Sequence, residues 1–529
     1  MSEAFDPAAG PGAAGPAGFV AVDLGATSGR VMLGIVSDGG DAPVGGVELV
    51  ECGRFPNGPV ASAGSGGDEL RWDFEALWRG ILGGLREAAR VAAGRGVEVR
   101  GIGVDSWAVD HGLLDDDGRL IARPWCYRDG RNEPARTRVY ERVPFAEHYA
   151  VTGLQDLPFT SVFQLVAGAA DDDWRRVAQV LLIPDLVTYR LTGRRVAEVT
   201  NASTTGLVDA RSRTWADPLI ARLAAGFPEL GDLRSRLPEL VEPGAVVGRL
   251  LPEIREATGL GDVPVYAVAS HDTASAVAAA PLAAEPGEPA PGAAPRAAAY
   301  VSSGTWSLVG LELDAPVLTD ASRAANFTNE LGVDGTVRYL RNVMGLWILN
   351  ECVREWSEAD VAAGGPAVDL GSLLDAAAGE PGGRCLLDVE GEEFLAPGDM
   401  AGRVRAAIAG PVDGAAGEAG DVPDTRPALV RVILDSLAAG CAQVIGRAAA
   451  LAGVEVTAVH VVGGGSQNDL LNRLIAEATG LPVHAGPVEA TALGNLLVQA
   501  RAAGATSATI RDVVRASAAL RTYAPAPAV

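Results

Sequence analysis

Short runs of apolar residues alternate with longer amphipathic segments along most of the chain. The apolar runs have the length of strands and cover residues 19–23, 30–36, 99–105, 181–185, 263–269, 299–303 and 459–462. Apolar side chains recur at helical spacing in residues 73–94, 430–452 and 468–479. Strands that alternate with helices are typical of an α/β protein. The pattern therefore predicts buried strands covered by helices.

Stretches rich in Pro, Gly and Ala interrupt this pattern. Residues 281–298 have no periodicity, which is typical of a linker, and they divide the chain into an N-terminal domain at 19–280 and a C-terminal domain at 299–525. A second such stretch, 409–423, is expected to be a surface insertion. Residues 1–18 have neither a basic segment nor a long apolar run, so they predict a disordered tail and not a signal peptide.

Composition and charge narrow the class of protein. A chain of 529 residues is too long for one core, so two or more domains are expected. The net charge of −24 argues against nucleic acid or an anionic membrane as a partner. No apolar stretch of about 20 residues is evident, so no membrane span is predicted. The five cysteines are widely spaced, which favours reduced thiols in the cytoplasm over a disulfide scaffold.

A glycine-containing turn joins the first two predicted strands. Its sequence, VDLGATSGR, covers residues 22–30. Small residues let backbone N–H groups approach a phosphate, and the hydroxyl groups add donors. Asp23 can hold a hydrated Mg²⁺ ion, and Arg30 can reach a terminal phosphate. A plain hairpin with a glycine turn explains the same pattern, because such turns are common.

Two further glycine-rich turns lie in the second half of the chain. Residues 302–310, SSGTWSLVG, repeat the arrangement of strand, turn and strand. Residues 461–474, VVGGGSQNDLLNRL, place three glycines between a buried strand and a helix, which suits a nucleotide phosphate or adenosine against the backbone. The Gly-Lys-Ser/Thr ending of a Walker loop is absent. Because the three turns occupy both halves, they predict a nucleotide cleft between the halves.

A His-Asp pair follows another predicted strand. In ASHDTASAV, residues 269–277, Asp272 stands where a helix is expected to begin. An aspartate there stabilises the helix N-terminus. A kinase also needs a carboxylate that orients and deprotonates the acceptor hydroxyl. The pattern alone leaves both roles open, and His271 is a candidate hydrogen-bond partner of a sugar.

From about residue 19 to residue 520 the chain resembles the FGGY carbohydrate kinases. The segments that carry the resemblance include AVDLGATSGRVMLG, GVDSWAVDHGLLDDDG, GLQDLPFTSVFQL, TNASTTGLVD, AVASHDTASAV, YVSSGTWSLVG, NFTNE, RNVMGLWIL, VVGGGSQNDLLN and AGPVEATALGN. The resemblance implies two ribonuclease-H-like domains of the actin-like ATPase fold, with ATP and Mg²⁺ in the cleft between them. It also implies transfer of the γ-phosphate to the 1-hydroxyl of L-rhamnulose.

The resemblance also implies the residues of the site. The implied ATP contacts are Ala26, Thr27, Ser28, Gly29, Arg30, Thr305, Asn350, Gly464 and Asn468. The implied sugar contacts are Ala108, His271, Asp272, Thr273 and Asn342, with Asp272 as the proton acceptor. Two positions depart from the family, which commonly has Gly at Ala108 and Gln at Asn350. The methyl group of Ala108 narrows the sugar side, and the shorter Asn350 loses its contact or makes it through water.

Two alternatives remain at this point. The chain is a kinase for another ketose, such as L-fuculose or D-xylulose, or it is an actin-like ATPase that acts as a chaperone or filament subunit. The second class does not need the His-Asp pair, and sugar would not change its ATP turnover. Asp105, Trp107 and Asp110 are weaker candidates for the sugar pocket, because core packing explains Trp107 equally well.

Overall fold

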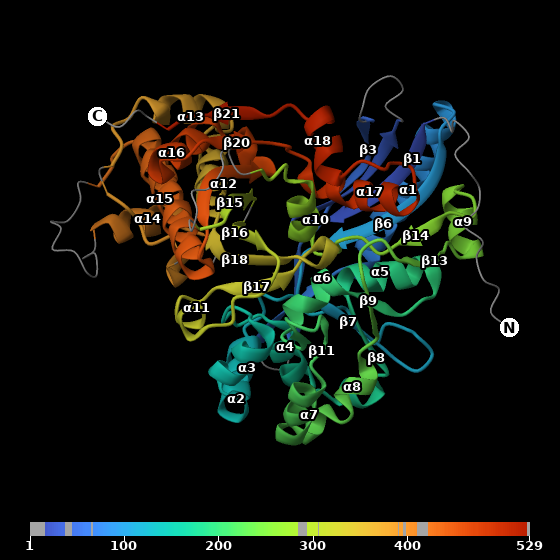
Figure 1. The fold of residues 1–529 in the computed structure, drawn as a ribbon. Helices are drawn as coiled ribbons and strands as arrows, with labels where there is room; N and C mark the ends of the chain where they lie inside the picture. Colours follow the sequence, from blue (N-terminus) through green and yellow to red (C-terminus); the bar gives the residue numbers. More distant parts are fainter. Residues whose placement is uncertain are drawn as a thin grey trace.

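A computed structural model describes most of the chain. The described residues are 16–37, 45–64, 67–283, 294–304, 306–383, 385–389, 391–394, 398–409 and 422–525. Thr305 lies outside them, as do most of the predicted tail and the middle parts of the predicted linker and of the 409–423 insertion. The described chain forms two sheet-based domains and a third lobe that lies below both in Figure 1.

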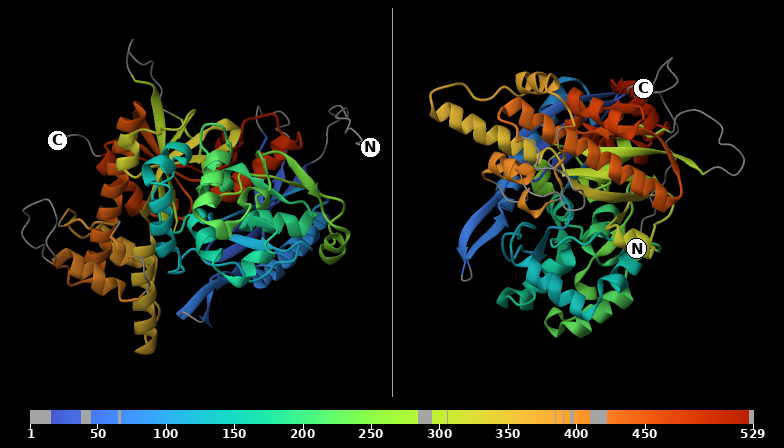
Figure 2. Two further views of the ribbon diagram at one scale, coloured as in Figure 1. Left: turned by 90° about the horizontal axis from the view of Figure 1, so that it is seen from below. Right: turned by 90° about the vertical axis from the view of Figure 1, so that its left-hand side faces the viewer.

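The first domain is built on a six-stranded sheet in the order β13-β14-β6-β1-β2-β3. Strand β1 is antiparallel to β2 and parallel to β6. The strands and helices of this domain are β1 (Ala17–Leu24), β2 (Ser28–Val36), β3 (Val47–Pro56), α1 (Phe74–Gly94), β6 (Glu98–Ser106), α5 (Ile183–Thr192), β13 (Val246–Arg249), α9 (Pro252–Thr258), β14 (Pro264–Tyr266) and α10 (Asp272–Ala279). Helix α1 buries the apolar face that its sequence predicts. The hairpin of β4 (Pro59–Gly64) and β5 (Gly67–Trp72) extends away from the sheet (Figure 2, blue).

The second domain has a seven-stranded sheet in the order β17-β18-β16-β15-β19-β20-β21. Its elements are β15 (Arg296–Ser303), β16 (Trp306–Leu313), α11 (Asp320–Ala324), β17 (Thr328–Leu331), β18 (Val337–Met344), α12 (Trp347–Ala362), α13 (Leu370–Ala378), α14 (Met400–Ala409), α15 (Arg426–Ala452), β19 (Glu455–Val462), α16 (Asp469–Thr479), β20 (Val483–Ala485), α17 (Ala490–Ala502), α18 (Ile510–Ser517) and β21 (Arg521–Tyr523).

Both sheets share one strand arrangement. The series β3-β2-β1-β6-β14 corresponds to β18-β16-β15-β19-β20, because in each sheet three antiparallel strands are followed by two parallel ones. This repeated order confirms the expected pair of ribonuclease-H-like domains. It also makes the β1–β2 turn equivalent to the β15–β16 turn.

The third lobe is inserted between β6 and β13 of the first sheet. Its elements are β7 (His111–Leu114), α2 (Asn132–Arg142), α3 (Phe145–Thr152), α4 (Ser161–Gly168), β8 (Gln179–Leu182), β9 (Val196–Glu198), α6 (Val199–Ala202), β10 (Val208–Asp209), β11 (Thr214–Trp215), α7 (Asp217–Gly226), α8 (Leu233–Arg236) and β12 (Glu239–Val241). It has its own apolar core, which includes Phe163, Trp174 and Trp215. Two residues of the second sheet, Leu331 and Val337, join that core, so the lobe touches both domains.

The last helices of the chain return to the first domain. Helix α17 packs on β1, β6 and α10 although it is far from all three in sequence, and Figure 1 shows it in red beside the blue strands. Gly494 permits this packing, because a Cβ atom there would lie 1.9 Å from the carbonyl oxygen of Ser275. Gln499 donates from Nε2 to the carbonyl of Val20 at 3.0 Å. The two domains are therefore joined by more than one crossing of the chain.

Several predicted boundaries differ from the structure. The strand expected at 181–185 ends at Leu182, and Pro184 stands in the first turn of α5, where its fixed φ favours a helix. Strand β14 is shorter than the expected 263–269. Strands β1 and β15 begin at Ala17 and Arg296, earlier than expected, because these residues already pair with β6 and β19.

Helix α15 differs from the expectation that the chain has no long apolar segment. Among the described helices it is the one long and apolar enough to cross a membrane. However, 67% of its most apolar window is buried, and the helix packs against β16, β18 and α16. This burial assigns its apolar residues to the core of the second domain.

Candidate active site

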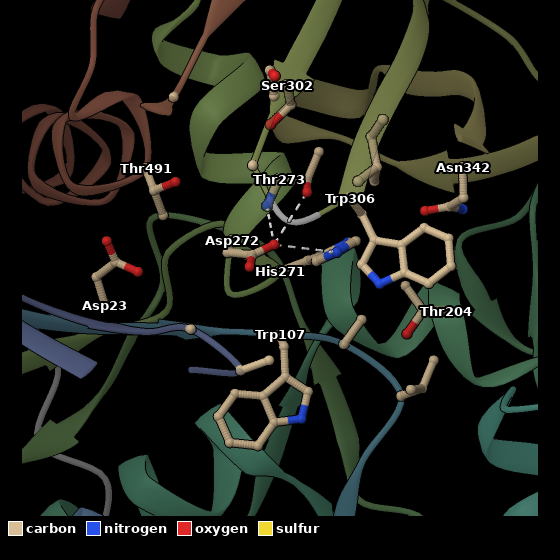
Figure 3. A pocket seen from close by; sticks show the side chains of 18 of the residues that line it. Asp23, Trp107, Thr204, His271, Asp272, Thr273, Ser302, Trp306, Asn342 and Thr491 are labelled. Carbon is tan, nitrogen blue, oxygen red and sulfur yellow. Dashed lines mark hydrogen bonds and ion pairs between the residues drawn. The ribbon is translucent and has the colours of Figure 1, made fainter. Parts of the chain in front are cut away.

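A cavity of about 480 Å³ lies where both domains and the third lobe meet. The β1–β2 turn, the end of β6, the start of α10, the β15–β16 turn and the glycine turn after β19 all contribute to its walls. The close view in Figure 3 shows Asp272 near the centre, with Asp23, Ser302 and Asn342 on different sides. The three glycine-rich turns predicted from sequence therefore surround one cavity.

The first turn is held in shape by its own backbone and by Asn57. The Gly25 N–H donates to the Ser28 carbonyl at 2.9 Å. Asn57 donates from Nδ2 to the Gly25 carbonyl at 2.8 Å and from its backbone N–H to the Thr27 carbonyl at 3.0 Å. Ala26, like its neighbours in the turn, lines the cavity. The turn therefore presents small side chains and a fixed backbone to the cavity.

Arg30 lies beside two carboxylates on the same wall. Its Nη2 and Nε atoms lie 2.7 and 3.1 Å from Oδ2 of Asp23, and Nη1 contacts Glu489. Burial would lower the pKa of Arg30, but the charges of Asp23 and Glu489 outweigh it and raise that pKa. Glu489 comes just before α17 in the sequence. It reaches Arg30 because α17 packs back on the first domain. The sequence segment AGPVEATALGN carried Glu489, but the pattern gave it no role.

The other two turns pack on each other through Ser303. Gly463 has a φ of +80°, a backbone conformation that residues other than glycine rarely adopt. A Cβ atom on Gly465 would lie 2.0 Å from Ser303 Oγ. The middle glycine, Gly464, has no atom within 4 Å of such a Cβ position and faces the cavity. Two glycines are thus needed for packing, and the third leaves room beside the cavity.

Three of the predicted ATP contacts lie away from the cavity walls. Gly29 is in β2, where a Cβ atom would lie 2.3 Å from the ring of Phe55, so packing explains the glycine. Asn468 caps α16 by accepting the Leu471 N–H at 3.0 Å. Asn350 is exposed on α12. Thr305 lies outside the described residues.

Ala108 lines the cavity next to a strained residue. Val109 has a φ of +67°, which is unusual for a β-branched side chain. Its carbonyl accepts hydrogen bonds from Ser161 Oγ at 2.5 Å and from Gln164 Nε2 at 3.3 Å. The third lobe therefore holds the backbone that carries Ala108, and strain of this kind often lies at functional sites.

Asp272 is the first residue of α10, and His271 occupies the cap position before it. Its Oδ1 atom accepts the Thr273 N–H at 2.5 Å and the Thr273 hydroxyl at 3.1 Å, and it lies 3.4 Å from Nε2 of His271. The side chain is 33% exposed, toward the cavity. Burial raises the pKa of Asp272, the neighbouring His271 side chain opposes this, and Asp23 adds to the rise.

Two charged residues behind His271 were missed by the sequence reasoning. Arg338 is fully buried in β18, and Glu330 stands opposite it in β17 and also lines the cavity. Both lie within contact distance of His271 Nδ1. The segment NFTNE contains Glu330, and Arg338 lies in the same strand as the predicted contact Asn342, but the sequence gave neither charged residue a role.

Of the weaker candidates, the two aspartates are buried beside the cavity and Trp107 lines it. Asp105 is fully buried and accepts a hydrogen bond from Asn495. Asp110 accepts hydrogen bonds from Trp72 Nε1 at 2.6 Å and Trp107 Nε1 at 3.0 Å, and burial raises its pKa to about 6. Neither aspartate is on the cavity wall, whereas one edge of Trp107 is, although its ring packs 4.4 Å from that of Trp72.

Oxygen donors are available for a magnesium ion. Asp23 and Glu489 both present carboxylates to the cavity, and Mg²⁺ prefers oxygen ligands and keeps several waters. Among the described residues, no group of three or more His, Cys, Asp or Glu side chains is placed to hold a metal. The donor set thus fits an ion held mainly by phosphate and water rather than a protein cage.

The chain matches known protein families over most of its length. Residues 59–278 match the N-terminal domain of the FGGY family of carbohydrate kinases, and residues 299–503 match the C-terminal domain. A rhamnulokinase of Bacteroides thetaiotaomicron is 40% identical over 511 residues, which cover 96% of each chain. A rhamnulokinase of Pectobacterium carotovorum is 40% identical over 512 residues, 96% of this chain and 93% of that one.

Solved structures show the same fold. A gluconate kinase of Lactobacillus acidophilus has a TM-score of 0.72 at 16% identity, covering 97% of this chain and 94% of that one. A glycerol kinase of Plasmodium falciparum with ADP has a TM-score of 0.71 at 13% identity, with the same coverage. Their low identity shows the fold alone, but both family domains match here. The chain therefore belongs to the FGGY family of carbohydrate kinases and is an ATP-dependent sugar kinase.

Proposed function

We propose that this kinase transfers the γ-phosphoryl group of ATP to the 1-hydroxyl of L-rhamnulose, with Asp272 as the general base. The observation that carries the proposal is that Asp272 shares one cavity with the glycine-rich turns of both domains. The choice of sugar is supported by the curated relatives, which are named rhamnulokinases at 37–40% identity. The reaction needs ATP, and we expect it in the cytoplasm.

The nucleotide phosphates are proposed to lie between the equivalent turns of the two sheets. Ala26, Thr27 and Ser28 offer backbone N–H groups and hydroxyls from one side. Gly464 leaves room on the other side, and Thr305 stays a predicted contact there. Arg30 is close enough to the cavity to exchange its contact with Glu489 for a phosphate oxygen. A bound Mg²⁺ ion, held by Asp23 through water, would offset charge on the phosphates.

The sugar is proposed to bind between α10 and the third lobe. His271, Thr273 and Asn342 supply polar groups, and Ala108 limits the space on the opposite side. Asn342 donates from Nδ2 and from its backbone N–H to Gln155 Oε1 at 3.2 and 3.1 Å, so the third lobe fixes its orientation. Asp272 then orients the hydroxyl and takes its proton as the phosphoryl group passes to oxygen through a loose transition state.

A panel of ketoses tests the proposed reaction. We expect ADP release from ATP to depend on sugar and to be fastest with L-rhamnulose, because the sugar hydroxyl must replace water at the γ-phosphate. The panel includes L-fuculose and D-xylulose, measured with purified protein against a no-sugar control. A tenfold preference for another ketose would change only the substrate, whereas sugar-independent ATP turnover would favour the actin-like ATPase.

The raised pKa of Asp272 predicts an acid limb in the pH profile. A protonated carboxyl group cannot accept the hydroxyl proton, so kcat/KM should be lost as pH falls through the pKa of Asp272. Burial moves this pKa above the ordinary aspartate value, and the charge of Asp23 acts in the same direction. The limb should therefore lie at higher pH than that of an exposed aspartate. Melting temperatures over the same pH range separate this loss from acid unfolding, and a flat profile down to the ordinary aspartate range contradicts the assignment.

A further inference from the structure

We propose that Arg338 and Glu330 are positioning residues that fix the protonated nitrogen of His271 and thereby hold Asp272 ready to accept a proton. The inference rests on the proposed role of Asp272. It assigns a function to a buried ion pair of which Glu330 lines the cavity and Arg338 does not.

The ion pair reaches His271 from the second sheet. Glu330 and Arg338 are direct partners in the β17–β18 ladder, and Oε2 of Glu330 lies 3.0 Å from Nη1 of Arg338. Nη2 of Arg338 lies 3.0 Å from Nδ1 of His271, and Glu330 Oε2 lies 3.2 Å from the same nitrogen. Burial would raise the pKa of Glu330, but Arg338 and His271 outweigh it and lower that pKa. The buried pair is therefore ionised on both sides.

This contact decides which nitrogen of the imidazole carries the proton. An arginine side chain has donors only and keeps its protons in proteins. Nη2 of Arg338 is in hydrogen-bond geometry with Nδ1, whereas the nearby Glu330 Oε2 makes no hydrogen bond within the described residues. The geometry therefore assigns Nδ1 as the acceptor of the Arg338 hydrogen bond. With Nδ1 as an acceptor, the ring proton of His271 is on Nε2, because the hydrogen bond at one ring nitrogen sets the state of the other. Nε2 is the atom that faces Asp272.

The surrounding side chains therefore engage only one of the two carboxylate oxygens of Asp272. Both donors of Thr273 hydrogen-bond to Oδ1 of Asp272, and His271 Nε2 lies 3.4 Å from the same oxygen. In the described part of the chain no hydrogen bond engages Oδ2. One oxygen is thus fixed by the protein, and the other is left for the sugar hydroxyl. The domain that carries two of the glycine turns thereby also orients the base on α10 of the first domain.

A double variant tests the inference. Arg338→Met with Glu330→Gln removes both buried charges together at similar volume, so no unpaired charge remains. We expect kcat with L-rhamnulose to fall by about 10- to 100-fold, because a small displacement of a catalytic group has effects of this size. The KM for ATP should stay within about twofold, since the pair lies on the sugar side. If the pair were only structural, the double variant would lose stability without the fall in kcat at a nearly unchanged KM for ATP.

A matched control and a second measurement keep the inference testable. Arg431 and Asp435 form another largely buried ion pair, 2.9 Å apart in α15 and away from the cavity, so Arg431→Met with Asp435→Asn should leave kcat unchanged. Nitrogen NMR of ¹⁵N-histidine-labelled wild-type protein reports the tautomer directly, with the His271 signal assigned by its loss in His271→Gln. We expect Nε2 protonated and Nδ1 unprotonated, and this measurement does not need the double variant to fold.

The outcomes separate the inference from the proposed function. Wild-type kcat in a folded double variant, or a His271 protonated at Nδ1 in the wild-type protein, would overturn the positioning role. If Asp272→Asn abolishes activity while the double variant is normal, only the positioning role is lost. If Asp272→Asn is active, the base itself has been assigned wrongly.

Discussion

Replacing Asp272 by Asn is expected to lower kcat by about 10²–10⁴-fold, the usual contribution of a positioned general base. The amide cannot accept the sugar proton, but it has nearly the same shape. His271, not Asp272, occupies the cap position of α10, so loss of the charge affects only the first helical turn. The cost in the free energy of unfolding should be a few tenths of a kcal/mol. The KM for ATP should hardly change, because Asp272 is proposed to face the sugar.

The measurements are kcat, a nucleotide titration and a thermal melt on the same variant. Asp320→Asn is the matched control, since Asp320 is also the first residue of a helix, α11, and is not on the cavity wall. That variant should keep its kcat. A near-normal kcat in Asp272→Asn would show that Asp272 is not the base and acts only at the start of α10. The search for the base would then turn to Asp23, because Asp105 and Asp110 do not reach the cavity.

Replacing Gly494 by Ala is expected to destabilise the protein and to impair catalysis together. The added Cβ atom would lie 1.9 Å from the Ser275 carbonyl oxygen and 2.6 Å from its carbonyl carbon, and neither backbone atom can rotate away. Helices α17 and α10 must therefore separate. Overpacking of this kind costs about 3 kcal/mol, at the upper end of its usual range. Because α10 begins with Asp272, kcat should also fall, by about 10-fold or more.

Gly446→Ala is the control for this variant. Gly446 is an exposed glycine inside α15, and no atom lies within 4 Å of its Cβ position. Alanine is the better helix former, so this change should stabilise the protein by about 0.5–1 kcal/mol without affecting kcat. Urea unfolding and kcat are measured for both variants. Wild-type stability and kcat in Gly494→Ala would mean that the contact between α10 and α17 does not position the site.

Local pattern was enough to predict the fold class and the turns of the site. The apolar runs around Phe19, Val99 and Val459 became central strands, because a strand buried on both faces needs apolar residues at consecutive positions. Glycine-rich turns after such strands were visible for the same reason. The resemblance to a family then connected the turns to ATP and the His-Asp pair to a sugar, and the family and the kinase activity are confirmed.

Individual glycines and amides could not be interpreted from their neighbours in sequence. Gly29 makes room for Phe55 of the next strand, and its contact with ATP stays a prediction. Asn468 caps the helix that follows it. Gly29 stands between two cavity residues along the chain, and Asn468 stands four positions after one. Which side of a turn or strand faces the cavity is set by the neighbouring element, and the sequence of the turn does not contain that information.

The sequence by itself determined the alternation of strands and helices, the three glycine-rich turns and the position of Asp272 at the start of a helix. Only the tertiary structure brought Glu489 to Arg30, α17 to the first sheet, and the Glu330–Arg338 pair to His271. The physical reason is that these contacts join residues far apart in the chain, and buried charges must be paired whatever their separation in sequence. An arginine in a strand such as β18 shows its role only when the carboxylate and the imidazole beside it are known.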